Sequence, residues 1–391
     1  MYTLRKGTLL VVSILTILSS MTLSPDLPGI HAQFHTLPHA DLWTRLVLTI
    51  HALFIALGAP LAGYIIDRLG RKPLLLIATI VYGGAGISGL FLNELLPLLV
   101  SRVFLGLATA GTMTAATTLI ADYYTGSERS QVAGWQTAAM NFGGVFALLL
   151  AGLLADRNWH FPFAIYGVSF LLIPLVISTI IEPPSIQRGV KNSSLVERFP
   201  WSEALILYIT MLVAQILFFF VPVQLPFYLQ KLIHSTATQS GVAVAAATLC
   251  TGCIALLYPK LNHFLERRVL IAIGFAGLSG GLLILGIAGN YPLIVLGALF
   301  TGVMMGILLP TLSLWILALT PSLLRGRAVS GLTASMFLGQ FLSPFISQPL
   351  SQWGGFATMY SISGWIALVV AGGWIVAQRF TVPALVKPRH G

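Results

Sequence analysis

Three residues combine a side chain that could do chemistry with a place inside, or at the end of, a long apolar run. Asp26 closes the first run, His51 lies in the second, and Arg102 is the only basic residue well inside a run. If these runs cross a membrane, a charge at the centre costs about 2.5 kcal/mol or more and is usually functional. We expect the three to form one polar cluster, with Arg102 and Asp26 paired, that binds a substrate or carries a proton. The alternatives are a solvated helix end for Asp26 and, for His51, a hydrogen bond to a backbone carbonyl.

Other chemical motifs in the sequence are better explained by helix packing. Cys250 and Cys253 form a CxxC pattern, but both lie in an apolar run. Ser279 stands in a Gly-Leu-Ser-Gly-Gly pattern that no histidine–aspartate set accompanies. We find no nucleotide-binding Walker pattern. The sequence therefore predicts no enzymatic activity, no cofactor and no metal.

Histidines recur every four residues at His31, His35 and His39, between the first two apolar runs. Pro38 interrupts any helix there, so the spacing does not place the three side chains on one face. A solvated loop is the simpler interpretation. A weak metal-binding or pH-sensing patch is the alternative.

The composition places the chain in a membrane. Of its 391 residues, 57% are hydrophobic and 8% are charged, and the mean hydropathy is +0.90. Soluble domains carry about 25% charged residues. Lipid requires every backbone polar group to be bonded internally, and continuous apolar runs of about twenty residues suit helices rather than barrel strands. The formal charge of +10 lies in short loops, so it indicates topology rather than nucleic-acid binding.

The apolar runs predict an all-α integral membrane protein with twelve transmembrane helices in two pseudo-symmetric six-helix bundles. We predict an N-terminal bundle over 1–181, a cytoplasmic central loop over 182–200, a C-terminal bundle over 201–379 and a cytoplasmic tail over 380–391. The predicted spans are 8–25, 43–66, 74–92, 97–121, 131–154, 162–181, 202–222, 237–258, 269–288, 293–319, 328–349 and 357–378.

The distribution of lysine and arginine predicts the orientation, because cytoplasmic loops carry an excess of both. Of the 21 basic residues, seventeen fall in one set of loops and tails, and three, Arg45, Arg157 and Lys231, fall in the opposite set. Arg102 is the remaining one. Both termini and the central loop are therefore expected in the cytoplasm, with the protein in the inner membrane of a bacterial-type cell.

Residues 63–72, Gly-Tyr-Ile-Ile-Asp-Arg-Leu-Gly-Arg-Lys, resemble the loop signature of the major facilitator superfamily, Gly-x-x-x-Asp-Arg-x-Gly-Arg-Arg/Lys. They lie in the expected place, between the second and third helices. Residues 102–106 resemble the fourth-helix Arg-x-x-x-Gly signature of the same family. The twelve helices and the central loop extend the resemblance over the whole chain. It implies a transporter that rocks one bundle against the other around a central site, giving access to each side of the membrane in turn.

The resemblance assigns Asp67 to a gate at the cytoplasmic edge. The carboxylate should meet the N-terminal end of the eleventh helix, near residues 326–328, when the central site faces outward. A carboxylate at a helix N-terminus gains about 0.3–1 kcal/mol. The contact would hold the two bundles together in that state.

The other residues of the signature support this gate. Arg71 should pair with Asp122 at the cytoplasmic end of the fourth helix. Gly63 and Gly70 should let backbones approach closely. Arg68 is expected mainly to fix the orientation in the membrane.

Within the superfamily the sequence looks most like the twelve-helix drug:proton antiporter and efflux branch. The fifth helix has the closely spaced glycines of that branch, Gly143 and Gly144, but lacks its Gly-Pro pair. None of the 11 acidic residues lies at mid-membrane, which disfavours a cation selector and favours a neutral, zwitterionic or anionic substrate at Arg102. Amide, methionine and aromatic side chains should line the cavity, with plain helix packing as the alternative for each. The candidates are Gln136, Met140, Asn141, Gln215, Phe219, Gln224, Met304, Met305, Trp315, Met336 and Gln340.

We therefore expect a secondary active transporter that exports a small amphipathic or polar molecule, such as a drug-like compound, a siderophore or a metabolite, with protons as the coupling ion. An uptake symporter or facilitator with the same fold is the main alternative. A membrane sensor or receptor without transport is the alternative from another class. The expected partners are a small-molecule substrate, membrane lipids and protons, and the expected state is a monomer.

Overall fold

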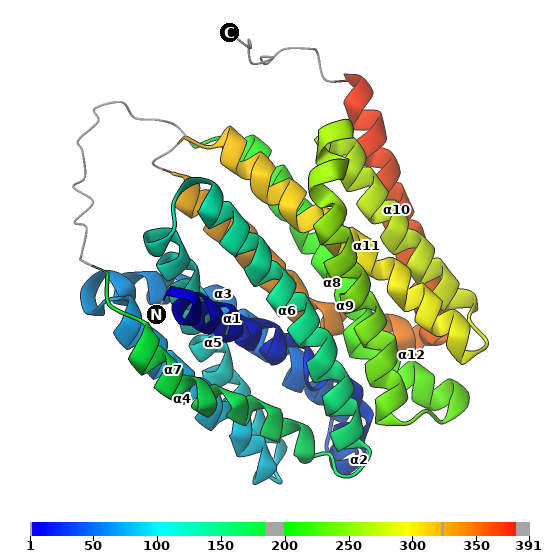
Figure 1. The fold of residues 1–391 in the computed structure, drawn as a ribbon. Helices are drawn as coiled ribbons and strands as arrows, with labels where there is room; N and C mark the ends of the chain where they lie inside the picture. The colour runs from blue at the N-terminus through cyan, green and yellow to red at the C-terminus, as the bar shows by residue number, and fades with distance from the viewer. Residues whose placement is uncertain (1, 184–198, 322–323, 381–391) are drawn as a thin grey trace.

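The computed structural model describes residues 2–183, 199–321 and 324–380, and the side chains of all of these except 377–380. Within these ranges every regular element is a helix, as the composition predicts. The predicted tail and most of the predicted central loop fall outside the described residues. Figure 1 shows long helices lying side by side.

The elements are named here in chain order. They are α1 (Tyr2–Met21), η1 (Ser24–Asp26), α2 (Leu27–Phe34), α3 (Ala40–Leu69), α4 (Arg71–Ile87), η2 (Ser88–Leu90), α5 (Leu95–Tyr123), α6 (Gly126–Ala155), η3 (Phe161–Gly167), α7 (Val168–Thr179), α8 (Trp201–Ile233), α9 (Ala237–Phe264), α10 (Arg267–Ile287), α11 (Tyr291–Leu319) and α12 (Arg325–Phe380).

Twelve membrane crossings follow from these elements. In the described residues, 11 helical segments are long and apolar enough to cross a membrane, and the last of them lies within α12. That helix has 56 residues and is interrupted at Gly355, whose φ of 76° lies in the left-handed region that favours glycine. The break separates an arm over 325–354 from an arm over 356–380. The predicted fold class is confirmed.

Several helices extend beyond their predicted bounds. The first segment continues through η1 and α2 to Phe34, where the sequence suggests a polar loop. The helix α8 has 33 residues, about 50 Å at 1.5 Å per residue, and passes through Pro222 and Pro226. Proline is tolerated in membrane helices because neighbouring groups satisfy the carbonyls it leaves free. Arg45, counted above with the loops although it falls within the predicted span 43–66, lies inside α3 and is 3% exposed.

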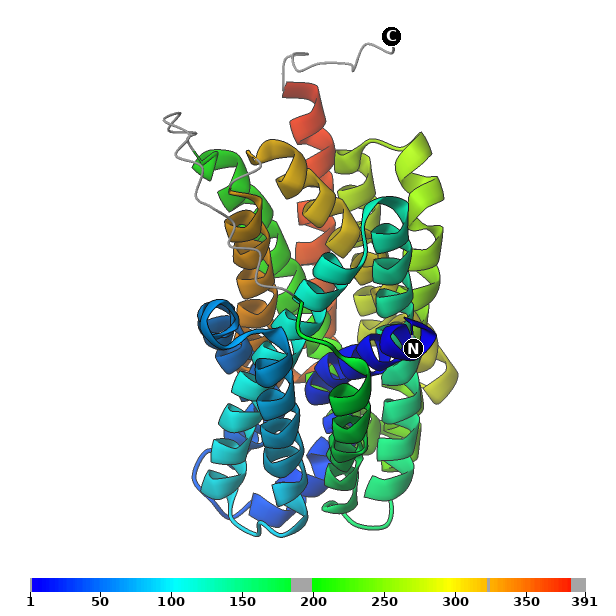
Figure 2. The same cartoon turned by 60° about the vertical axis from the view of Figure 1, so that its left-hand side comes forward.

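The helices form two groups, α1 to α7 and α8 to α12, each packed mainly within itself. Between the groups, α3 packs on the first arm of α12, α6 on α9, and η1 and α2 on α8 and α9. Figure 1 shows the groups meeting at the end where α2 lies and diverging toward the end where α12 finishes, and Figure 2 shows the same two groups from another side. We call the first end the α2 end. We call the opposite end the Arg71 end, after Arg71, the residue that begins α4.

The burial of α6 shows the same asymmetry. Between residues 126 and 143 only Val132 is buried, whereas the part nearer the α2 end contains the five other buried residues of this helix. They are Gly144, Ala147, Leu148, Ala151 and Gly152. The two groups are therefore in close contact at the α2 end.

Candidate transport site

A histidine from one group and a glutamine from the other meet near the middle of the molecule. His51 of α3 places its Nε2 atom 3.4 Å from the amide nitrogen of Gln340 of α12 and 3.3 Å from the hydroxyl oxygen of Ser20 of α1. The three residues are at most 6% exposed. His51 thus lies at the contact between the two groups, as a substrate-binding residue of a two-bundle transporter would.

Near this contact, two further polar side chains, Gln215 and Ser343, have atoms without a hydrogen-bond partner among the described residues. Gln215 of α8 packs against Gly339, where an added Cβ atom would lie 2.8 Å from the Gln215 Cβ. Its Oε1 atom and the hydroxyl of Ser343 are buried without a hydrogen-bond partner in the described part of the chain. Because an unsatisfied buried polar group is costly, a ligand or water that supplied the missing hydrogen bonds would be favoured here.

An apolar patch adjoins these polar groups. Ala52 and Ile55 follow His51 on α3, and Phe337 precedes Gln340 on α12 by three residues. They pack with Ala110 of α5, and half-buried Met113, Met336 and Phe341 surround them. The combination of amide, imidazole and hydroxyl groups with an apolar patch matches an amphipathic ligand.

Among the described residues Arg102 makes no ion pair or hydrogen bond with His51 or Asp26. Arg102 is 1% exposed and extends from α5 toward α4, where its Nη2 atom donates to the carbonyl oxygens of Ala85 (2.9 Å) and Gly86 (3.1 Å). Its Cζ atom lies 5.0 Å and 5.1 Å from the ring centroids of Phe163 and Tyr166. These carbonyls and aromatic faces hold the guanidinium inside the first group of helices, while its Nη1 atom is buried without a hydrogen-bond partner among the described residues. Where the chain is described, no ion pair joins Arg102 to Asp26, so the predicted pair is wrong for this structure.

Asp26 is buried at the junction of η1 and α2. It is 2% exposed, which excludes the solvated helix end considered above. Its Oδ2 atom is buried and has no hydrogen-bond partner among the described residues. A Cβ atom added at Gly29 would lie 2.8 Å from its Oδ1, so the backbone of α2 closes over the carboxyl group. Asp26 is therefore a buried carboxyl group without a basic partner in the described structure.

At the Arg71 end the predicted pair forms. Arg71 Nε donates to Asp122 Oδ2 at 3.0 Å. Glu182 adds a contact that sequence reasoning missed, because its carboxylate accepts from the backbone N–H groups of Arg71 (2.8 Å) and Lys72 (2.7 Å). These are the first residues of α4, where a helix has free N–H groups and favours a negative charge.

The other residues of the loop signature differ in their surroundings. Asp67 is exposed and, within the described ranges, makes no ion pair or hydrogen bond. Its contact with residues 326–328 is expected in the outward-facing state and stays a prediction. A Cβ atom added at Gly63 would have no neighbour within 4 Å, so no backbone approaches closely there. Gly70 does need to be glycine, because its φ is +93° and an added Cβ would lie 2.7 Å from Glu182 Oε1. Arg68 stacks on the ring of Tyr64, with its Cζ atom 4.6 Å from the centroid.

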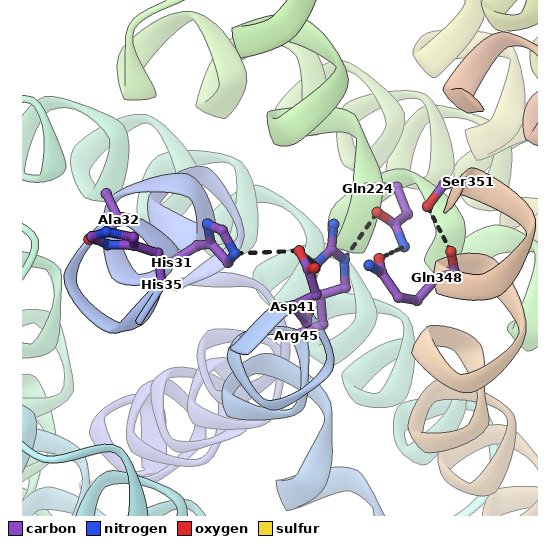
Figure 3. Close-up of polar contacts among 8 residues, drawn as sticks. All are labelled: His31, Ala32, His35, Asp41, Arg45, Gln224, Gln348 and Ser351. Atoms are coloured by element: carbon purple, nitrogen blue, oxygen red, sulfur yellow. Dashed lines mark hydrogen bonds and ion pairs between the residues drawn. The ribbon is translucent and has the colours of Figure 1, made fainter. Parts of the chain in front are cut away.

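The α2 end has a polar network that sequence reasoning missed (Figure 3). Arg45 of α3 donates from Nε to Gln224 Oε1 of α8 at 3.0 Å, and its Cζ atom lies 4.0 Å from the ring centroid of Phe227. Gln224 in turn donates to the hydroxyl oxygen of Ser347 of α12 at 2.8 Å. These hydrogen bonds join the two groups of helices through the buried side chains of Arg45, Gln224 and Ser347.

The network reaches the surface through Asp41 and His31. Asp41 Oδ1 lies 3.6 Å from Arg45 Nη1 and 3.2 Å from His31 Nε2. The spacing of Asp41 and Arg45, four residues apart at the start of a helix, is the signal that could have revealed the pair. Counting Arg45 as a loop residue concealed it.

The remaining cavity candidates are dispersed. Gln136 donates to Ser13 inside the first group (2.8 Å), and Asn141 to the carbonyl of Thr137 on its own helix (2.9 Å). Four others pack in the helix core or against it: Phe219, Met304, Met305 and Trp315. Met140 is half-buried on α6. Of the predicted set, Gln215, Met336 and Gln340 lie at the central contact, and Gln224 lies in the network at the α2 end.

Comparison with known proteins agrees with this architecture. The sequence model described as Major Facilitator Superfamily matches residues 9–256 and 206–390. A multidrug resistance protein MdtG from Rahnella sp. (strain Y9602) is 26% identical over 365 residues, covering 87% of this chain and 85% of that protein. The bacillibactin exporter of Bacillus subtilis (strain 168) is 23% identical over 361 residues, covering 86% of both chains. Among solved structures, a D-xylose-proton symporter superposes with a TM-score of 0.79 at 16% identity, covering 95% of this chain and 97% of the other.

Proposed function

This chain belongs to the Major Facilitator Superfamily, and we propose that it exports a small amphipathic or polar molecule in exchange for protons. It is a transporter and not an enzyme. Export is supported by relatives that cover most of the chain, a multidrug resistance protein and a bacillibactin exporter. A drug-like compound, a siderophore or a metabolite would fit the proposal.

The orientation is part of the proposal. The excess of lysine and arginine in the loops of the Arg71 end supports placing that end in the cytoplasm, with both termini, and the α2 end in the periplasm. The contacts at the α2 end would then close the central site toward the periplasm. At the opposite end Asp67 has no partner among the described residues, which supports a site that opens to the cytoplasm, the state from which an exporter loads its substrate.

The side chains around the contact between His51 and Gln340 indicate the class of substrate. His51, Gln340, Gln215 and Ser20 offer hydrogen bonds without a carboxylate, and an apolar patch lies beside them. Such a site suits a molecule with an uncharged polar group and an apolar body. Because Arg102 is held inside the first group of helices, it supplies no support for an anionic substrate at this contact.

The burial of Asp26 is the observation that supports coupling to protons. A carboxylate buried without a partner costs several kcal/mol, whereas a protonated carboxyl group is buried far more cheaply. Asp26 lies where η1 of one group packs on α8 and α9 of the other, so separating the groups would expose it to water. It is therefore suited to hold a proton when this end is closed and to exchange it when this end opens.

The test uses the purified protein in liposomes that contain a pH-sensitive dye. A pH gradient is imposed, and amphipathic cations, zwitterions, anions and polar metabolites are added in turn. We expect one class to release protons, with the release lost in Asp26→Asn and kept in Glu94→Gln, an exposed carboxylate near the same end. Proton release that survives in Asp26→Asn would overturn Asp26 as the coupling residue. Labelled substrate that crosses without proton movement would favour a facilitator.

A further inference from the structure

The contact between α6 and α9 contains a carboxylate that bridges the two groups of helices. Asp156 follows the last residue of α6, and Ala237 and Thr238 are the first two residues of α9. Asp156 Oδ1 accepts from the backbone N–H of Ala237 at 2.6 Å, and its Oδ2 accepts from the backbone N–H of Thr238 at 3.2 Å and from the Thr238 hydroxyl. A carboxylate of one group thus binds the N-terminus of a helix in the other.

The N-terminus of α9 is arranged to leave these two N–H groups available. Thr236 and Gln239 form a capping box, in which the Thr236 hydroxyl oxygen accepts from the Gln239 N–H and the Gln239 side chain accepts from the Thr236 N–H. This reciprocal pair satisfies two of the helix's free donors. The capping box does not use the N–H groups of Ala237 and Thr238. These are the two N–H groups that Asp156 binds.

The helices touch closely beside this contact. A Cβ atom added at Gly152 would lie 2.8 Å from the carbonyl oxygen of Ala237, and one added at Gly241 would lie 2.6 Å from the carbonyl oxygen of Leu148. Each helix therefore presents a glycine to the backbone of the other. Smooth backbone surfaces of this kind can separate without withdrawing interlocked side chains.

We propose that Asp156 is a positioning residue for transport, whose bond to the N-terminus of α9 holds the periplasmic side closed. The proposal rests on the orientation given under the proposed function and goes beyond it. Asp156 is exposed, so water can replace its hydrogen bonds when the groups separate, and the contact is reversible. Charge-assisted hydrogen bonds to a helix N-terminus favour the state in which they form.

Asp67 is the matching carboxylate at the opposite end of the same group. It is exposed and unengaged in the described structure, whereas Asp156 is bonded. The family resemblance assigns Asp67 to a helix N-terminus of the other group in the outward-facing state. The two carboxylates would then act in alternation, one engaged in each state, so removing either one should favour the state that the other stabilises.

The test measures opening of the α2 end by thiol labelling. Ser240, one turn into α9 and 2% exposed, is changed to cysteine in full-length protein that carries Cys250→Ala and Cys253→Ala. A membrane-impermeant maleimide is added to intact cells and to inverted vesicles, without substrate. We expect Asp156→Asn to raise the labelling rate in intact cells about tenfold. The neighbouring Arg157→Gln, an exposed control, should leave the rate unchanged.

A second substitution distinguishes a gating role of Asp156 from a local disruption of α9. Adding Asp67→Asn to Asp156→Asn should restore slow labelling, because it weakens the contact that stabilises the opposite state. A local disruption of α9 would not be repaired from the other end of the molecule. Unchanged labelling in Asp156→Asn, or fast labelling that Asp67→Asn does not slow, would overturn the proposal. Labelling that rises only in inverted vesicles would instead overturn the proposed orientation, and neither result depends on the substrate or on proton coupling.

Discussion

His51 of α3 and Gln340 of α12 lie 3.4 Å apart at their side-chain nitrogen atoms, and this is a direct polar contact between the two groups of helices at the centre of the molecule. Both residues are almost fully buried. A ligand that binds here must replace or share this contact. The pair is therefore the place where binding can change how the groups are held together.

The first prediction concerns this pair. Changing Gln340 to Leu removes an amide from the contact while preserving bulk, so we expect the KM for a transported compound to rise about tenfold, the effect of one lost hydrogen bond. Initial rates of dye-reported proton release in liposomes would measure it. Gln136→Leu is the matched control, because that amide bonds Ser13 inside one group and should leave the KM unchanged. Equal KM values for the two variants would remove Gln340 from the binding site.

A second prediction concerns the stability supplied by Arg102. Lysine in its place keeps the charge but cannot present a planar fork to the carbonyls of Ala85 and Gly86. We expect Arg102→Lys to destabilise the protein by about 2 kcal/mol, since hydrogen bonds to a charged group are lost and a buried charge is left poorly satisfied. Thermal unfolding in detergent would measure the change. A variant as stable as the parent, with transport abolished, would show that Arg102 acts in transport and not in packing.

The ion pair at the Arg71 end gives a third prediction. Arg71 and Asp122 are 18% and 13% exposed at their side chains, so solvent screens their attraction only in part. We expect a double-mutant cycle with Arg71→Gln and Asp122→Asn to give a coupling energy of about 1 kcal/mol. Unfolding free energies of the four proteins would supply the measurement. Strictly additive effects would mean that the pair contributes nothing to stability.

Gly70 and Gly63 provide a fourth prediction with a built-in control. Alanine at position 70 would have to adopt a φ of +93° and would displace the Glu182 carboxylate from the start of α4. The strained backbone alone should cost about 1–2 kcal/mol. Gly63→Ala meets no neighbour within 4 Å and replaces a poor helix former by a good one, so it should be neutral or slightly stabilising. Similar unfolding midpoints for the two variants would contradict this account of Gly70.

The fold could be predicted from sequence because apolar runs of membrane length leave few alternatives to helices. The limits of the helices could not, since proline at positions 222 and 226 is a breaker in water but is accommodated in a packed membrane helix. The predicted span therefore ended at 222, whereas α8 continues to Ile233 and carries the buried Gln224.

The candidate site was predictable in part. His51, Gln215 and Gln340 were selected by type and by helix, and the structure places them at the contact between the groups. The partner of Arg102 could not be found from side chains, because it is a set of backbone carbonyls and aromatic faces. Glu182 and Asp156 are likewise bound by backbone N–H groups, and such partners cannot be recognised from residue types.

Arg45, His51 and Asp67 all belong to α3, a helix of 30 residues and about 45 Å. One end of this helix lies at the contacts of the α2 end, its middle lies at the candidate site, and its other end carries Asp67, which is unpaired among the described residues. On the proposed function, such a helix would act as a lever, because rotation about a ligand held at His51 would move its two ends in opposite directions. Pro60 lies between His51 and Asp67, where a proline lets a helix bend. The stiffness of α3 at that point would therefore set how much of a movement at one surface of the membrane reaches the other.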